Sequence, residues 1–425
     1  MLTKEDNERL CRVGPGTPTG DAFRRFWIPF LLPEELATPD GEPLRVRLLG
    51  EDLIAFRDTG GKLGLLDRYC PHRRVDLFYG RNEQHGLRCP YHGWKFDTTG
   101  KILEMPAEPA DTRMMENTRI KSYSIMEWGG VIWAYMGDPA YKPETPPLLE
   151  WAIVPESQRY ITKRLQRTNY AQGVEGGIDS SHVGILHSKL DPAKAGLPFR
   201  DRQVSPVSGV PYLASDTAPK FFVRPSRHGM TIGARRNASE DSYYWRITQF
   251  LLPFYTMIAP SKDDGPLMGH AWTPIDDYNC WVFTMTWRGD RPLNNEEMDI
   301  GAVHGTTKSD GSYQPLLGPD TNYGLDREEQ RLKSMTGIQG IGMQDTAVQE
   351  SMGPIVDRSL ETLGTGDAAI NRFRKLILSL SQELESTGAV SVASNPDWYK
   401  VRSAGVVLPH ATDFMEGAAQ SIEVK

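Results

Sequence analysis

Two pairs of candidate metal ligands lie close together in the first quarter of the chain. Residues 70–94 read CPHRRVDLFYGRNEQHGLRCPYHGW and contain Cys70, His72, Cys89 and His92, spaced C-x-H, sixteen residues, then C-x2-H. Zinc accepts two cysteines and two histidines, but zinc pairs usually run Cys-Cys and then His-His. One cysteine and one histidine from each loop instead fit an asymmetric [2Fe–2S] cluster, with thiolates on one iron and imidazoles on the other.

A second set of candidate ligands lies in residues 169–187, NYAQGVEGGIDSSHVGILH, where Asp179, His182 and His187 form D-x2-H-x4-H. On an undistorted helix Asp179 and His182 share a face, whereas His182 and His187 point roughly 140° apart. The glycines of this segment suggest that the backbone bends enough for the two imidazoles to converge. Two histidines and a carboxylate from another segment form the facial triad of non-haem Fe(II) oxygenases. Taken alone, the pair could equally be two ordinary polar or core histidines.

The carboxylate of such a triad must come from elsewhere in the chain, and residue type alone does not select it. The candidates are Asp345, Glu350, Asp357 and Asp367.

Candidate substrate-binding residues lie on the predicted strand YYWRITQF. Because side chains alternate along a strand, Tyr244, Arg246 and Phe250 share one face. Arg246 could bind a carboxylate through two hydrogen bonds, or it could point outward on a solvated face. Ser181, beside the histidines, is a weaker candidate for contact with substrate.

The other residues with reactive or charged side chains receive structural interpretations. Cys11 and Cys280 have no partner pattern and are predicted to be small apolar core residues. His85 is predicted to lie in a surface loop, and Arg235 and Arg236 are predicted to be a solvated pair near a turn.

The elements that must position these residues change character along the chain. Short strands are predicted in residues 45–69 and 118–137, and a proline-rich linker in 142–147. Further strands are predicted within 219–290. A helix is predicted to begin near Asp367, because apolar residues then recur at spacings of three or four. The last ~35 residues show no strong period and are expected to wrap over a surface.

Length and composition support a globular protein of two or three domains. The chain has 425 residues, 48 Lys and Arg against 55 Asp and Glu, and a net charge of −7, which argues against nucleic acid as the main partner. No signal peptide is visible, and no apolar run approaches the ~20 residues of a membrane span, so we expect a cytoplasmic protein with no membrane contact.

The first motif resembles the Rieske domain of ring-hydroxylating oxygenases, and the second resembles the mononuclear-iron motif of their alpha subunits. The stretch GIGMQDTAVQESMGPI resembles the late acidic motif of the phthalate 4,5-dioxygenase branch, with Asp345 at the ligand position. Glu175 stands where many ring-hydroxylating enzymes have asparagine, which favours the same branch. The resemblance covers nearly the whole chain, from residue 23 to the helix after Asp367.

This resemblance implies an α+β protein. An N-terminal segment (1–40) would pack on the catalytic domain, followed by an all-β Rieske [2Fe–2S] domain (41–145). A catalytic domain (146–425) with a central antiparallel sheet and flanking helices would follow.

The resemblance also implies roles for the motif residues. Cys70 and Cys89 would bind one iron of the cluster, and His72 and His92 the other. His182, His187 and Asp345 would bind a mononuclear Fe(II). Asp179 would bridge His182 and, across a subunit interface, His92. Alternatively, Asp345 would only cap a helix, and Glu350 would be the next candidate for the third ligand.

The implied function is that of a terminal oxygenase using O₂. Residues 364–369, GTGDAA, match the G-x-G-x-x-A pattern of a dinucleotide-binding site, but the residues before Gly364 are not predicted to form the strand that such a site requires. Electrons would therefore come from a separate NAD(P)H-dependent flavin/iron–sulfur reductase, and the assembly would be a homotrimer or hexamer. The substrate would be a small aromatic acid, dihydroxylated as phthalate is. The alternatives are O-demethylation of a methoxylated aromatic acid and, third, a Rieske electron carrier without catalysis.

Overall fold

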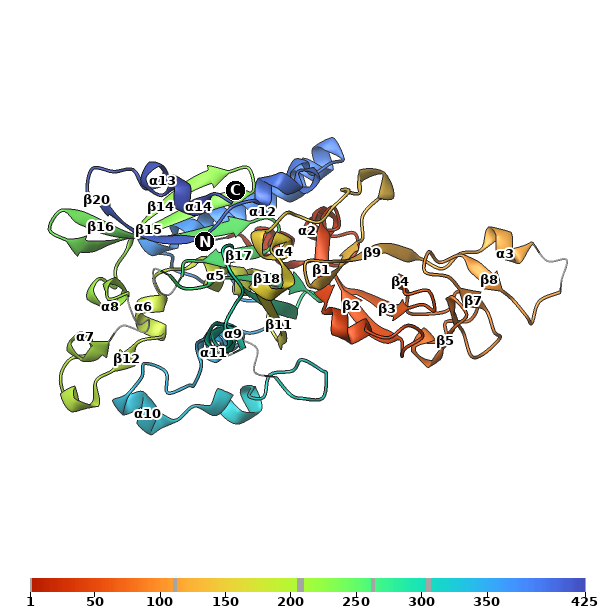
Figure 1. Ribbon diagram of the computed structural model, residues 1–425, viewed down its shortest axis with the longest axis horizontal. Coiled ribbons are helices and arrows are strands. Elements are labelled where there is room, and N and C mark those ends of the chain that lie inside the picture. Colours follow the sequence, from red (N-terminus) through yellow and green to blue (C-terminus); the bar gives the residue numbers. More distant parts are fainter. Residues whose placement is uncertain (1, 110–112, 205–209, 261–263, 303–306, 425) are drawn as a thin grey trace.

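The computed structural model describes residues 2–109, 113–204, 210–260, 264–302 and 307–424. In Figure 1 a smaller β-rich part, built from the first third of the chain, extends to the right of a larger part that contains both sheet and helices. The predicted α+β class is confirmed.

The smaller part contains two antiparallel sheets. One has six strands in the order β1-β10-β9-β4-β3-β2, and the other has four in the order β5-β6-β7-β8. Strands β3 and β4 carry Ile54, Phe56 and Leu66 into a core shared with Trp94 and Phe96 of the second sheet and its loops. The bounds of these strands are β1 Trp27–Leu31, β2 Leu44–Leu48, β3 Glu51–Arg57, β4 Leu63–Asp67, β5 Arg81–Glu83, β6 Gly86–Arg88, β7 Lys95–Phe96, β8 Ile102–Glu104, β9 Ser122–Trp128 and β10 Val131–Tyr135.

The larger part is built on an antiparallel sheet of eight strands. Its order is β11-β19-β18-β17-β16-β15-β14, and β20 pairs with β16 beside this path. The predicted strand YYWRITQF lies in it, as part of β16. The bounds are β11 Arg159–Gln166, β14 Lys220–Ser226, β15 Gly229–Ser239, β16 Ser242–Leu251, β17 Tyr255–Ile258, β18 Leu267–Pro274, β19 Cys280–Trp287 and β20 Ala404–Pro409, with a separate pair formed by β12 Lys189–Leu190 and β13 Gln203–Val204.

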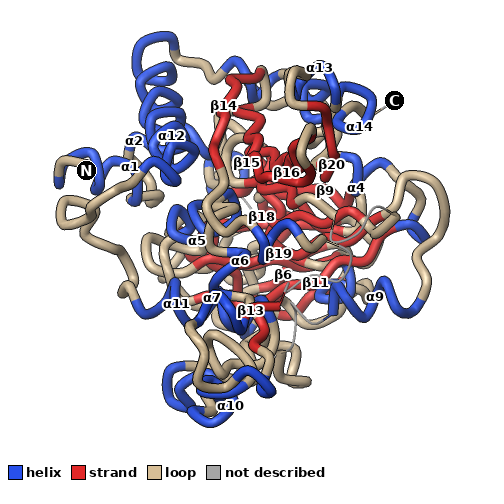
Figure 2. The backbone as a smooth tube through the Cα atoms, turned by 90° about the vertical axis from the view of Figure 1, so that its left-hand side faces the viewer, coloured by secondary structure: helices blue, strands red, loops and turns tan. Residues whose placement is uncertain are grey.

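Helices at the two ends of the chain gather on one side of this sheet. Figure 2 shows α1 (Lys4–Cys11) and α2 (Pro18–Phe23) beside the long helix α12 (Ala368–Thr387). As predicted, α12 begins directly after Asp367, and its apolar face buries Phe373, Ile377 and Leu380. The predicted domain boundaries at 40 and 145 stay predictions.

The C-terminal segment differs from its expectation in one respect. Rather than only wrapping over a surface, it forms β20, which pairs with β16 from Ser242↔Pro409 to Ile247↔Ala404. The sequence of β20, AGVVLP, is apolar but does not alternate with polar residues, so it carries no period-two signal for a strand.

The remaining helices are shorter. Among them, α5 and α6 flank the histidine motif, and α11 carries Asp345. The bounds are α3 Met114–Asn117, α4 Glu150–Ile153, α5 Tyr170–Ile178, α6 Val183–Leu186, α7 Phe199–Arg202, α8 Tyr212–Ser215, α9 Asn295–Ala302, α10 Arg327–Leu332, α11 Ile341–Ser351, α13 Phe414–Gly417 and α14 Ala419–Ile422.

Candidate active site

The two cysteine loops of the β domain have matching backbone geometry. The amide of Cys70 donates to the carbonyl of Val75, and the amide of Cys89 donates to the carbonyl of Trp94, both at 2.8 Å. The fourth residue after each cysteine has a positive φ, Arg74 at 58° and Gly93 at 74°. Each loop therefore turns back tightly on itself and presents its cysteine and histidine together.

The four side chains of these loops converge at one end of the β domain. Cys70 and Cys89 are buried, and the rings of His72 and His92 lie 4.4 Å apart between centroids. A hydrogen bond from Cys70 is the main reason that the pKa of Cys89 falls to about 6, while the pKa of Cys70 is raised. A thiol held in this way is readily available as a metal-binding thiolate.

The arrangement argues against a single zinc ion. Among the described residues, the one group of three or more candidate ligands whose ligand atoms all lie within 4.8 Å of one another contains none of these four residues. A four-coordinate zinc would require all four ligand atoms to surround one point. Nδ1 of His92 is also buried without a hydrogen-bond partner among the described residues, which fits a nitrogen that faces a metal. The residues fit a two-iron cluster.

The histidine segment of the larger domain is a helix broken at Asp179. Helix α5 ends at Ile178, Asp179 is extended, and α6 begins after His182. The Asp179 carboxylate accepts a hydrogen bond of 2.6 Å from the amide of Ser181, which stabilises the turn into α6. This break lets His182 and His187 face the same point, as the sequence predicts.

The glycines of the segment act differently from the expectation that they bend the backbone. Gly173, Gly176, Gly177 and Gly184 all keep φ outside the left-handed region. They instead permit close packing, since a Cβ at Gly173 would lie 2.2 Å from Trp272 and one at Gly184 would lie 2.3 Å from the carbonyl oxygen of Leu213.

His182, His187 and Asp345 form the compact ligand group. Oδ1 of Asp345 lies 3.6 Å from Nε2 of His182 and 3.3 Å from Nε2 of His187. Asp345 lies in the second turn of α11, so the alternative that it is a helix cap is wrong. Glu350 instead accepts hydrogen bonds from the Arg167 amide and the Tyr323 hydroxyl.

The far ring nitrogens of both histidines are held by acceptors. Nδ1 of His182 lies 3.2 Å from Asp179, and Nδ1 of His187 lies 2.7 Å from Oε1 of Gln344. The amide nitrogen of Gln344 donates to the Ile338 carbonyl, so its oxygen must face His187 and accept from Nδ1. Each Nε2 is then an unprotonated nitrogen available to a metal. The three residues thus fit a mononuclear iron site.

Electrostatics at this site reflect its charged neighbours. Burial alone would lower the pKa of His182, but the hydrogen bond with Asp179 and the charge of Asp345 raise it. Burial would raise the pKa of Asp179, and its bonds with His182 and Ser181 lower it instead. The pair is therefore polarised toward carboxylate and imidazole N–H, which orients the ring.

A cavity of about 130 Å³ opens beside the three ligands. Its charged and polar lining includes Asp179, Arg164, Arg246 and Gln349. The rest of the wall is largely apolar or aromatic and includes Val183, Val210, Leu213, Tyr244, Ile258, Met268, His270, Trp272 and Ile341.

Of the two substrate-binding residues expected from the sequence, one lines the cavity and the other does not. Arg246 does line the cavity and is only 8% exposed, so the solvated alternative is wrong for it. Ser181 is not among the residues that line the cavity. The expectation for Arg236 is also wrong, because its guanidinium is buried and donates to the carbonyl of Ser180 at 2.7 Å. Residues 236 and 246 lie on neighbouring strands, and the sequence alone does not reveal which faces point inward.

Sequence reasoning missed Gln344 and Arg164. Gln344 immediately precedes Asp345 on α11, and a polar residue beside a ligand is a usable signal for a residue that orients another ligand. Arg164 lies on β11, far from both motifs in the sequence, and no local pattern distinguishes it.

Comparison with known families decides the class of protein. The Rieske [2Fe-2S] domain family matches residues 26–124, and the family described as LigXa C-terminal domain like matches residues 134–425. The chain is a Rieske oxygenase alpha subunit. It is therefore an O₂-using oxidoreductase with a Rieske [2Fe–2S] domain, and the alternative of a pure electron carrier is wrong.

Relatives of this Rieske oxygenase subunit cover most of its length. It is 40% identical over 390 residues to the phthalate 4,5-dioxygenase oxygenase subunit of Pseudomonas putida, covering 89% of this chain and 86% of that protein. It is 36% identical to the 3-chlorobenzoate-3,4-dioxygenase oxygenase subunit of Comamonas testosteroni, covering 100% and 99%. It is 32% identical to the 5,5'-dehydrodivanillate O-demethylase oxygenase subunit of Sphingobium sp., covering 89% and 80%.

A solved structure supports the fold of the subunit. Dicamba monooxygenase bound to dicamba matches with a TM-score of 0.58 at 19% identity, covering 85% of this chain and 98% of that chain. As an oxygenase subunit of a multicomponent system, the chain needs a partner that delivers electrons. No helix in the described ranges is long and apolar enough to cross a membrane.

Proposed function

We propose that this Rieske oxygenase subunit hydroxylates a small aromatic carboxylate, by cis-dihydroxylation of a phthalate-like substrate. The observation that carries the proposal is Arg246 in the wall of the cavity. Its side chain makes no hydrogen bond or ion pair with any residue in the described ranges, although it is 8% exposed. A buried guanidinium without a hydrogen-bond partner is costly even with the charge of Asp179 nearby, and a substrate carboxylate would supply the hydrogen bonds.

The rest of the cavity suits an aromatic ring. Apolar and aromatic side chains such as Leu213, Ile258 and Trp272 form most of the wall. A ring anchored by its carboxylate at Arg246 would lie against this wall with an edge toward His182 and His187. Two of the relatives bear names of aromatic carboxylates, phthalate and 3-chlorobenzoate, which supports the same substrate class.

The proposed roles of the metal-binding residues follow from their geometry. Cys70, Cys89, His72 and His92 would hold the cluster, and His182, His187 and Asp345 would hold the mononuclear iron. When bound, the cluster supplies electrons and the iron activates dioxygen. Asp179 orients His182, Gln344 orients His187, and the apolar wall excludes water from the reacting ring.

Electron delivery is proposed to cross between subunits. In Figure 1 the cluster end of the β domain, marked by β5, β7 and β8, points away from α5 and α6. The two metal sites of one chain are therefore not neighbours. We propose a head-to-tail homotrimer or hexamer in which His92 of one subunit meets Asp179 of the next, served by a separate NAD(P)H-dependent flavin/iron–sulfur reductase.

Product analysis tests the reaction type. The purified subunit is incubated with a reductase, NADH and ¹⁸O₂, and with phthalate, 3-chlorobenzoate or a methoxybenzoate in turn. Dihydroxylation places both labelled oxygens on the ring, and this is the expected result for a carboxylated ring. O-demethylation, the second candidate, releases formaldehyde and a phenol; it is favoured by the O-demethylase relative. Formaldehyde without any dihydrodiol across the panel would reject dihydroxylation.

The carboxylate site has its own test. Arg246→Gln should weaken productive binding of an anionic substrate by about 1.5–3 kcal/mol, the range for hydrogen bonds to charged groups, seen as a higher KM. The control is Arg235→Gln, because Arg235 lies on the adjacent strand and stacks over Tyr243, with 4.1 Å from its guanidinium carbon to the ring centroid. An amide analogue of the substrate should be insensitive to Arg246→Gln. Equal losses for the acid and the amide would contradict carboxylate binding by Arg246.

A further inference from the structure

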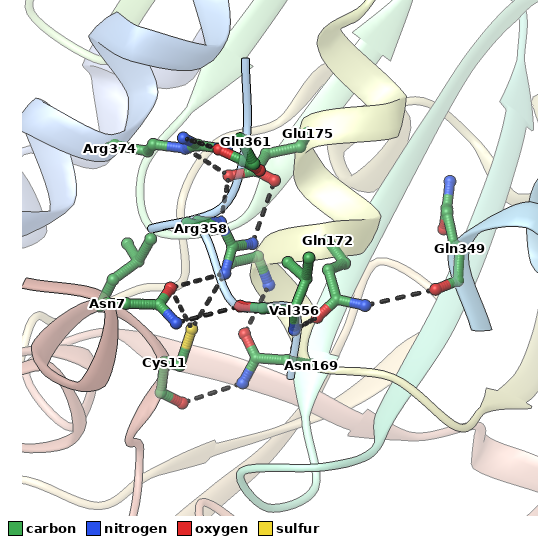
Figure 3. Close-up of polar contacts among 12 residues, drawn as sticks. Asn7, Cys11, Asn169, Gln172, Glu175, Gln349, Val356, Arg358, Glu361 and Arg374 are labelled. Atoms are coloured by element: carbon green, nitrogen blue, oxygen red, sulfur yellow. Dashed lines mark hydrogen bonds and ion pairs between the residues drawn. The ribbon is translucent and has the colours of Figure 1, made fainter. Parts of the chain in front are cut away.

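A buried network of four charged side chains lies behind helix α5. The Glu175 carboxylate accepts hydrogen bonds from Arg358, both at 3.0 Å, and from Nε of Arg374 at 2.8 Å. Arg374 also donates two hydrogen bonds to Glu361, at 2.7 and 3.0 Å. Figure 3 shows these contacts joining α5 to residues 358–361 and to α12, which are more than 180 residues away in the sequence. Two positive and two negative charges balance each other.

The network holds Glu175 as a fixed anion. The Arg358 residue is 0% exposed and Arg374 is 2% exposed, so both guanidinium groups depend on protein partners. Burial would raise the pKa of Glu175, but the two arginines lower it. Removing one member of a buried, hydrogen-bonded ion pair leaves an uncompensated charge, which makes such contacts hard to displace.

The N-terminal helix closes the network from the opposite side. Arg358 donates to Oδ1 of Asn7 at 3.0 Å and lies 3.2 Å from Sγ of Cys11, both on α1. The side-chain amide of Asn7 donates to the carbonyl of Val356 at 3.0 Å. Residues 356–358 are therefore clamped between α1 and α5 (Figure 3).

The same segment also connects α5 to α11, which carries Asp345. The amide of Val356 donates to Oε1 of Gln172 on α5 at 2.8 Å, and Nε2 of Gln172 donates to the carbonyl of Gly353 at 3.0 Å. Gly353 follows α11 by two residues. The stretch from 353 to 358 thus fixes where α5 and α11 lie relative to each other.

These contacts act on the ligand group because Glu175 lies in the last turn of α5, and Asp179 directly follows the end of that helix. Asp179 and His182 follow the end of α5, and Asp345 faces them from α11. A rotation of α5 by even a small angle would move the Asp179 carboxylate, and with it the ring of His182. None of the four network members lines the cavity, so they do not touch substrate.

We infer that Glu175 is a positioning residue, which acts through Arg358 and Arg374 to set the geometry of His182 and Asp345 for the mononuclear iron. This inference rests on the iron site of the proposed function, but not on the proposed substrate.

The test compares Glu175→Gln with Glu51→Gln. Glu51 lies in the β domain with a side chain 11% exposed, against 12% for Glu175, and it also bonds two cations, Arg24 and Lys121. Both variants should therefore lose similar stability in thermal unfolding. The protein with its cluster intact is freed of mononuclear iron with a chelator and titrated anaerobically with ferrous ion. Nitric oxide is then added, and the electron paramagnetic resonance spectrum reports the symmetry of the site.

Glu175→Gln should weaken ferrous ion binding at least tenfold and split the spectrum of the nitric oxide adduct into several species. Glu51→Gln should bind iron within twofold of the wild type and give its single spectrum. Wild-type affinity and spectrum in Glu175→Gln, or equal weakening in both variants, would overturn the inference and leave the network a purely structural one. A wild-type protein that binds no ferrous ion would instead reject the proposed function.

If Glu175→Gln does not fold, Arg358→Lys takes its place. Lysine keeps the charge but cannot make both hydrogen bonds to Glu175. We expect at least threefold weaker iron binding and the same split spectrum. Unchanged iron binding in folded Arg358→Lys would overturn the inference.

Discussion

At the scale of single residues, the iron site depends on one carboxylate that the sequence alone does not single out. Asp345 and Glu350 lie five residues apart on α11, and their side chains point in different directions. Asp345 faces His182 and His187, whereas Glu350 bonds to Arg167 and Tyr323. The rotation of α11 about its axis therefore decides which of the two carboxylates faces the histidines.

Replacing Asp345 tests this assignment. Asp345→Ala removes one of three protein ligands, so mononuclear iron should be lost and turnover should fall by orders of magnitude. The visible spectrum of the Rieske cluster should not change, because its ligands lie in the other domain. Metal analysis and product formation measure the two effects. Glu350→Gln is the matched control and should keep its iron; iron loss in the control but not in Asp345→Ala would reverse the assignment.

At the scale of elements, the cysteine loops need backbone conformations that few residues adopt. Gly93 has φ of 74°, and a Cβ there would lie 2.5 Å from Cγ of Pro106. Gly388, which ends α12, has the same φ of 74° but open space around it. A side chain at Gly388 would therefore meet backbone strain alone, whereas a side chain at Gly93 would meet the same strain and a steric clash.

Alanine substitutions at these two glycines should have unequal effects. Gly388→Ala should cost about 1–2 kcal/mol in the free energy of unfolding, the cost of a left-handed conformation. Gly93→Ala adds the clash with Pro106, so it should cost more and should also bleach the cluster at a lower temperature. Urea unfolding and the visible absorbance on heating measure both. Equal losses with a stable cluster would show that the Pro106 contact relaxes freely.

At the scale of the whole molecule, the two sets of candidate metal ligands lie far apart: β5, β7 and β8 mark the cysteine loops in the right-hand part of Figure 1, and α5 and α6 mark the histidine motif in the left-hand part. Asp179 lines the cavity and bonds His182, and its side chain is 23% exposed. A head-to-tail ring would bring His92 of the neighbour to this carboxylate.

Asp179→Asn tests the route between subunits. The variant keeps the shape of the side chain but loses the charge that orients the N–H of His182 and, in the proposed ring, would orient that of His92 of the next subunit. It should remain an oligomer, keep its red cluster and accept electrons from the reductase. Reoxidation of the prereduced cluster, followed by stopped-flow absorbance in a single turnover, should slow by orders of magnitude. Wild-type reoxidation, or an active monomer in sedimentation, would contradict an intersubunit route.

The sequence by itself indicated the candidate metal ligands that come in short pairs. Cys70 with His72, Cys89 with His92, and His182 with His187 are each separated by a few residues, so local spacing constrains how they can meet. Helix α12 was equally predictable, because its apolar face repeats within one segment.

The tertiary structure decided whatever depends on contacts between distant segments. Arg246 points into the cavity and Arg236 is buried against Ser180, although both lie on strands whose two faces look alike in the sequence. Glu175 meets arginines more than 180 residues away, at 358 and 374. Strand β20 exists because β16 pairs with it. The physical reason is common to all of these cases: a side chain's partner, and the face it occupies, are set by how separate elements pack.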